Sequence, residues 1–226
     1  MRTIFGVNSA TPINKKLKNG YTMYDWVKRQ KCFPAFCMRT LSGEDKITAE
    51  EIEFLKAKDC KIGLVIRDLT EAKVSGVNGT EDAFKAIETA KQLGVPQNEG
   101  IALFADIKSE WSVNHNWMIS FARTLINCGY RPGFIGNTDS SEDFNFGRQC
   151  SHYVLATRKE NQLNSVYWSV RPQYKFDPEV WATYAPSQLL PKDMHVWQYG
   201  TVDFHSIIVG KCYAHDELIA HCFWGE

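Results

Sequence analysis

The sequence predicts an α/β fold of the TIM, or (β/α)8, barrel type, formed by a single domain over residues 1–226. Short apolar runs rich in β-branched and aromatic residues recur along the chain, and segments with helical spacing separate several of them. The runs at 62–66 and 101–105 are apolar on both faces, which is expected of parallel strands covered by helices. The number of such runs, about eight, favours a closed barrel.

The order of the elements alone also fits an open doubly wound sheet. No Gly-rich phosphate loop follows the first apolar run, so the barrel is the favoured interpretation. The strand candidates lie at residues 3–8, 33–40, 61–68, 100–107, 131–136, 152–157, 166–170 and 194–199.

Helices between the strand candidates have recognisable starts and ends. Thr48 and Glu51 have the spacing of a capping box. Two longer helices are expected at residues 81–93 and 113–128, each ended by a glycine with a proline close behind. Their expected N-caps are Thr80 and Ser112, and their terminating pairs are Gly94 with Pro96 and Gly129 with Pro132.

The helical signal fades after about residue 140, and residues 158–193 form a polar, aromatic and proline-containing stretch. We therefore expect the second half of the barrel to be irregular, with short or missing helices.

The composition excludes several classes of function. Hydrophobic residues make up 44% and charged residues 23%, as in globular domains with a sizeable core. The 26 Lys and Arg residues balance 26 Asp and Glu residues, so we expect no nucleic-acid partner. No apolar stretch approaches the ~20 residues of a membrane span.

The cysteines indicate a reducing environment. Their number is seven, and they are scattered among apolar residues, which does not suit a disulfide framework. The first residues are too short an apolar run for a signal-peptide core. We expect a soluble protein that is cytoplasmic, or that is released or exported by a route not visible in the sequence.

Motifs for metals, cofactors and common nucleophiles are missing from the sequence. A Walker loop, a Ser nucleophile elbow and an H-E-x-x-H helix are absent. The cysteines and histidines at 212, 215, 221 and 222 match no standard zinc spacing. We therefore expect neither a metal nor a cofactor.

Polar residues at the carboxyl ends of the strands are the candidates for a site, because TIM barrels place their sites there. Asp106 is the strongest candidate, since the apolar run 101–105 delivers one carboxylate at its end. The alternative is that Asp106 caps a turn or pairs with Lys108. The other candidate strand ends are Asn8, Arg39, Asp68 and the run Trp197, Gln198 and Tyr199.

Hydrolysis of a glycosidic bond usually takes two carboxyl groups, so Asp106 needs a partner. Glu110, Asp68 and Asp203 are the candidates, and their spacing does not choose among them. Flat aromatic faces could stack on sugar rings, although packing in the core or at the rim is the favoured interpretation of each single aromatic. The aromatic candidates are Trp111, Trp168, Trp181, Trp197 and Tyr199.

The order of several segments resembles a known family. PAFCMRTL at 34–41, followed by ITAEEI at 47–52, is similar to a segment of the glycoside-hydrolase-like family called domain of unknown function 1906. Residues 79–96 and the strand IALFAD at 101–106 resemble its next helix and its aspartate-bearing fourth strand. GFIG at 133–136 resembles its fifth strand, and residues 196–204 resemble the tail that it shares with family 25 lysozymes. The resemblance covers roughly residues 4–205.

This resemblance implies a TIM barrel related to lysozymes, which cleave peptidoglycan between N-acetylmuramic acid and N-acetylglucosamine. Two positions depart from the lysozyme pattern. Asn8 stands where lysozymes carry an aspartate after the first strand, and Lys108 stands where their fourth-strand Asp-x-Glu has its glutamate. An ammonium group beside Asp106 favours the ionised carboxylate, which suits a nucleophile or electrostatic stabiliser and opposes a general acid.

The first hypothesis is a glycoside-hydrolase-like barrel that acts on a glycan, most plausibly bacterial peptidoglycan, in a cleft around Asp106. The alternative is a non-catalytic glycan-binding module that has lost the lysozyme acid, and a third is hydrolysis of an unrelated small molecule. A second carboxyl at ~5–5.5 Å from Asp106 suits a retaining pair and one at ~6.5–9.5 Å an inverting pair. The candidate catalytic residues are Asp106, Glu110 and Asp68, and the candidate substrate-binding residues are Asn8, Arg39, Lys108, Trp197, Gln198 and Asp203.

Overall fold

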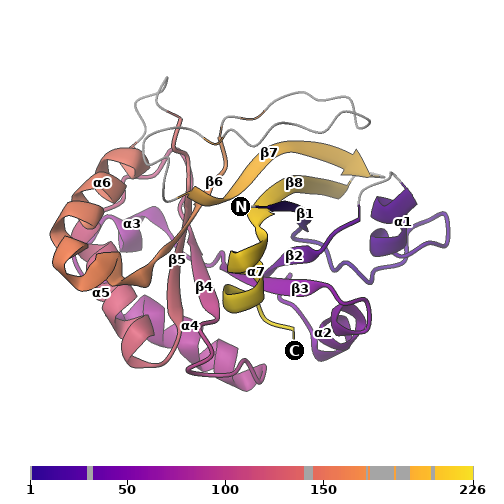
Figure 1. Ribbon diagram of the computed structural model, residues 1–226, viewed down its shortest axis with the longest axis horizontal. Helices are drawn as coiled ribbons and strands as arrows, with labels where there is room; N and C mark the ends of the chain where they lie inside the picture. The colour runs from indigo at the N-terminus through magenta and orange to yellow at the C-terminus, as the bar shows by residue number, and fades with distance from the viewer. Residues whose placement is uncertain are drawn as a thin grey trace.

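Eight β-strands close into a barrel in sequence order in the computed structural model (Figure 1). The structure describes residues 2–29, 33–139, 145–171, 173, 186, 194–204 and 207–225. The strands are β1 (Thr3–Asn8), β2 (Phe36–Thr40), β3 (Lys61–Ile66), β4 (Ala102–Asp106), β5 (Arg131–Gly136), β6 (Val166–Ser169), β7 (Met194–Phe204) and β8 (Ile207–His215). The predicted TIM-type barrel is thereby confirmed.

One strand departs from the all-parallel arrangement. Strands β1 to β7 pair in parallel with their sequence neighbours, whereas β8 is antiparallel to both β7 and β1. A parallel crossover needs about a dozen residues or more. Only residues 205 and 206 lie between β7 and β8 in the sequence, so these strands must run in opposite directions.

Helices α2 and α4 to α6 cover the outside of the barrel, with α2 on the side of β2 and β3 and α4 to α6 on the side of β4 and β5 (Figure 1). Helix α7 instead packs against the apolar cluster inside the barrel. None of the described helices is long and apolar enough to cross a membrane. The helices are α1 (Met23–Arg29), α2 (Ala49–Lys56), α3 (Glu71–Val74), α4 (Thr80–Gln92), α5 (His115–Asn127), α6 (Asn145–Thr157), the 3₁₀-helix η1 (Arg158–Asn164) and α7 (Asp216–Cys222).

The predicted helix starts are close to the observed ones. Thr48 caps α2, because its hydroxyl accepts a hydrogen bond from the backbone N–H of Glu51. The other two caps lie one or two residues from the prediction. Gly79 precedes α4, and Asn114 caps α5 by accepting a hydrogen bond from the backbone N–H of Asn116.

The prediction of a strand at 152–157 was wrong, and β8 was missed. The apolar run at 152–157 is the last part of α6, whose buried Phe146, Cys150 and Tyr153 follow helical spacing over a longer window. Strand β8 escaped notice because Gly210 and Lys211 interrupt its apolar run. Helix α6 has 13 residues, as many as α4 and α5, so the helices of the second half are not all short. Most of the stretch 158–193, where irregular structure was expected, lies outside the described residues.

The lower part of the barrel interior, at the end where the parallel strands begin, is packed with side chains. Phe223, which follows α7, places its ring 5.3 Å from that of Phe36 and 5.9 Å from that of Phe104. A Cβ added at Gly133 would lie 2.5 Å from the Phe104 ring, so glycine is needed beside this ring. Because apolar groups fill this end, space for a ligand remains at the opposite end, where the parallel strands have their carboxyl ends.

A half-buried histidine lies at the start of β7. The Nδ1 atom of His195 accepts a hydrogen bond from the backbone N–H of Tyr167 at 3.2 Å, and the two rings stack. Burial, with smaller contributions from His215 and Arg131, lowers the pKa of His195 from 6.5 to about 4. The folded protein therefore holds this imidazole neutral, whereas the unfolded chain protonates it below about pH 6.5.

This difference predicts that stability falls as the pH drops from about 6.5 towards 4. Between about pH 7 and pH 5, His195 should lower the free energy of unfolding by about 2 kcal/mol, because the unfolded state takes up the proton. Urea denaturation of the wild type and His195→Gln at both pH values measures this term. The exposed His152→Gln is the control and should keep the wild-type pH dependence, whereas equal pH dependence of His195→Gln and the wild type would contradict the prediction.

Candidate functional site

A cavity of about 310 Å³ opens at the carboxyl ends of the strands. Its size lies at the low end of the range for small-molecule sites, which is enough for one compact ligand. Most of its lining comes from the last residues of β1, β4 and β5, from residues just beyond β3, β4 and β6, and from β7. The lining residues are Asn8, Arg67, Asp106, Ile107, Lys108, Ser109, Ile135, Val170, Arg171, Gln173 and Gln198.

A chain of polar contacts crosses this cavity. Lys108 donates to Asp106 with an Nζ–Oδ2 distance of 2.6 Å, and Nε of Arg67 lies 3.8 Å from the same oxygen. Arg67 also donates from Nη2 to Oδ1 of Asn8 at 2.5 Å, and Asn8 donates from Nδ2 to Gln198 at 2.9 Å. The carboxylate of Asp106 therefore faces two cations, and its side chain is 15% exposed.

Arg67 is the site residue that the sequence analysis missed. Burial lowers the pKa of its guanidinium, and the nearby Asp106 carboxylate opposes that shift. Within the described part of the chain, its Nε is buried without a hydrogen-bond partner. The signal was present in the alternation along the third strand, because Val65 packs inside the barrel and residue 67 has the same phase.

Asp68, the predicted strand-end acid, lies on the opposite phase and outside the cavity. Ser42 donates to it at 2.6 Å, and Lys85 of α4 forms an ion pair with it. Burial acts to raise the pKa of Asp68, but the hydrogen bonds from Lys85 and Ser42 outweigh that effect and lower it. Asp68 is therefore paired with the outer helix layer and is not brought together with Asp106.

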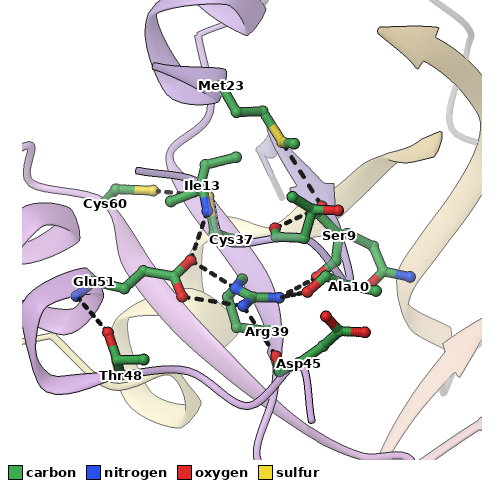
Figure 2. A network of polar contacts seen from close by, with 12 residues as sticks. Ser9, Ala10, Ile13, Met23, Cys37, Arg39, Asp45, Thr48, Glu51 and Cys60 are labelled. Atoms are coloured by element: carbon green, nitrogen blue, oxygen red, sulfur yellow. Dashed lines mark hydrogen bonds and ion pairs between the residues drawn. The ribbon is translucent and has the colours of Figure 1, made fainter. Parts of the chain in front are cut away.

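Arg39 is also turned away from the cavity, into a buried network (Figure 2). Its side chain is 0% exposed and pairs with Glu51 of α2, with an Nε–Oε1 distance of 2.6 Å. Its Nη1 donates to the backbone oxygens of Ser9 and Ala10 at 2.5 and 2.6 Å, and its Nη2 donates to that of Asp45 at 3.1 Å. Arg39 thus ties the segment after β1 to β2 and α2, and its donors are not available to a ligand.

Three of the aromatic candidates, Trp168, Trp197 and Tyr199, are buried in the core and do not line the cavity. Trp197 and Trp168 are 0% and 1% exposed, and Tyr199 stacks on Tyr213 with ring centroids 4.8 Å apart. Trp111 is partly buried against the outer core, and Trp181 lies outside the described residues. The expected stacking of Trp197 on a sugar is therefore excluded by its burial.

The other carboxylate candidates do not line the cavity either. Glu110 is exposed and does not line the cavity, and Asp203 lies exposed on β7, paired in register with Ile208 of β8. Among the lining residues that the structure describes, Asp106 is the sole carboxylate. No cluster of three or more His, Cys, Asp or Glu residues that could hold a metal ion occurs within the described ranges.

Comparison with known proteins finds solved structures that share the fold. No protein-family model matches the chain. No curated protein matches it either. The resemblance to the domain of unknown function 1906 thus remains an expectation from the sequence.

Solved structures share the barrel over nearly the whole chain. An uncharacterized protein of B. stearothermophilus superposes with a TM-score of 0.78 at 24% identity, covering 98% of this chain and 100% of the other. A lysozyme of Streptomyces coelicolor has a TM-score of 0.56 at 12% identity, covering 97% of this chain and 96% of the other. The catalytic domain of an endolysin from bacteriophage P40 of Listeria monocytogenes has a TM-score of 0.54 at 14% identity, again covering 97% and 96%. These identities establish a shared fold.

The contacts of Arg39 predict that even a conservative substitution lowers the free energy of unfolding substantially. Arg39→Lys keeps the charge but loses the planar donors to Glu51 and to the backbone oxygens of Ser9 and Ala10. We expect the free energy of unfolding to fall by about 3 kcal/mol or more, as when a buried pair is broken. Chemical denaturation measures this loss.

The control is Arg123→Lys, which alters the exposed pair of Arg123 with Glu160. Its effect should stay below about 1 kcal/mol. Equal stability of Arg39→Lys and the wild type would show that Arg39 is not the structural residue that its burial indicates.

Proposed function

We propose that this chain is a glycoside-hydrolase-like protein that binds a glycan, preferably a fragment of bacterial peptidoglycan, in the cavity over Asp106. The observation that carries the proposal is a small cavity at the carboxyl end of a TIM-type barrel, with Asp106 on its wall. The fold that this chain shares with a lysozyme and with an endolysin catalytic domain supports the choice of ligand.

The lining of the cavity suits a sugar. Asn8, Ser109, Gln173 and Gln198 offer neutral hydrogen-bonding groups, which hydroxyl and acetamido groups require. The side chains of Ile135 and Val170 add an apolar surface for the C–H face of a sugar ring. Such a mixture of apolar walls and a few convergent polar groups is typical of small-molecule sites.

Binding is better supported than lysozyme-type cleavage. A glycosidase of that type needs one carboxyl to protonate the leaving oxygen and a second to act as nucleophile or base. Asp106 is the one carboxylate in the described lining, and it is already paired with Lys108 and Arg67. Lys108 occupies the position of the lysozyme glutamate in the resemblance drawn from the sequence.

Hydrolysis is the second candidate function, and the shared barrel of the lysozyme and the endolysin domain favours it. In that case Asp106 would act as nucleophile or electrostatic stabiliser, and another acid would protonate the leaving group. Arg39, Asp68, Glu110, Trp197 and Asp203 are not part of either proposal, because none of them lines the cavity.

Calorimetry with a purified disaccharide of peptidoglycan, combined with an assay for new reducing ends on peptidoglycan, separates these functions. We expect binding by the wild type without new reducing ends. Asp106→Asn should weaken binding by about tenfold, because Lys108 and Arg67 lose the carboxylate that positions them on the cavity wall.

The matched control is Asp68→Asn, an equal change on the outer face of the barrel, which should bind like the wild type. New reducing ends that disappear in Asp106→Asn would replace the binding proposal by the hydrolase. Absence of binding by the wild type would contradict both.

A further inference from the structure

The cavity is basic, although the chain as a whole is not. The complete sequence balances 26 basic against 26 acidic residues. The described lining, in contrast, contains Arg67, Lys108 and Arg171 with Asp106 as the single acid. This imbalance is local and cannot be ascribed to the overall composition.

Asp106 does not use up the donors of the cations around it. Lys108 donates one N–H to Asp106, and an ammonium group has three N–H donors. Arg67 holds Asn8 with Nη2, and its buried Nε has no hydrogen-bond partner among the residues that the structure describes. A guanidinium has five N–H donors, so both side chains retain donors for a further acceptor.

Arg171 adds an exposed cation to the lining of the cavity. Its backbone N–H donates to the Ser169 hydroxyl at 3.3 Å, which fixes the main chain just beyond β6. Its side chain is exposed, and within the described ranges its guanidinium forms no ion pair. A basic group left free beside a partly buried arginine favours an anion in the space between them.

We propose that the glycan bound here carries a carboxylate, and that Arg67, Lys108 and Arg171 bind this group while the neutral lining holds the sugar. This inference rests on the proposed function and specifies its ligand as an acidic sugar. Guanidinium groups match the geometry of a carboxylate with two parallel hydrogen bonds, which suits this role. N-acetylmuramic acid has such a carboxylate on its lactyl group, and N-acetylglucosamine lacks it.

Two disaccharides form a matched pair of probes. N-acetylglucosaminyl-N-acetylmuramic acid and N,N′-diacetylchitobiose differ in the lactyl ether on one ring. We expect calorimetry at low salt to give about tenfold tighter binding of the acidic disaccharide, the effect of one charged hydrogen-bonding contact. The preference should shrink as the salt concentration rises to about 1 M, where the Debye length is about 3 Å.

Arg171→Met is the main variant, because the hydrogen bonds of Arg171 within the described part of the chain are made by its backbone. It should lose most of the preference for the acidic disaccharide. Lys108→Met tests a second cation of the same cavity and should also reduce the preference. Lys91→Met removes an exposed charge from α4, away from the cavity, and should behave like the wild type.

The outcomes separate the two proposals. Equal affinity of the wild type for both disaccharides overturns the inference and leaves the glycan-binding function standing. A preference that survives both Arg171→Met and Lys108→Met also overturns it, because the carboxylate is then recognised elsewhere. Binding of neither disaccharide overturns the proposed function itself.

Discussion

The alternation of side chains along each strand of the closed barrel determines which polar residues form the cavity. Residues of one phase point into the barrel, and residues of the other phase point towards the helices. Ala102 and Phe104 pack inside, so Asp106 at the end of the same strand faces the interior as well. Arg39 and Trp197 have the other phase, and both are buried in the outer layer.

This alternation also separates support from recognition. The inward residues form two sections. The lower section, where the parallel strands begin, is apolar and is closed by Phe223. The upper section, at the carboxyl ends of these strands, is polar and open to a ligand. The outward Arg39 fixes Ser9 and Ala10, directly after Asn8, and so holds one wall of the cavity from behind (Figure 2). Residues predicted as ligand contacts can thus be essential to the fold without touching a ligand.

The electrostatics of the upper section distinguish this barrel from the lysozyme pattern that its sequence resembles. A pair of carboxyl groups would make such a site acidic, whereas here Lys108 and Arg67 surround Asp106. Asn8 and Gln198 continue the polar contacts with neutral amides. The arrangement favours holding an anionic ligand over donating a proton to a leaving group.

The sequence predicted the barrel, most of its strands and the position of Asp106, because apolar runs, caps and strand ends are local signals. Several assignments failed because strand ends were taken as equivalent whatever their phase. Asp68 was chosen over Arg67 although Val65, two residues before Arg67, faces the interior. The hairpin of β7 and β8 depends on pairing between strands, which apolar runs alone do not encode.

The most direct test of the central claim is a crystal structure with N-acetylglucosaminyl-N-acetylmuramic acid bound. The account predicts the disaccharide in the cavity, with a sugar ring near Ile135 and Val170 and the lactyl carboxylate within hydrogen-bonding distance of Lys108, Arg67 or Arg171. A disaccharide bound on another face of the barrel, with the cavity over Asp106 unoccupied, would contradict it.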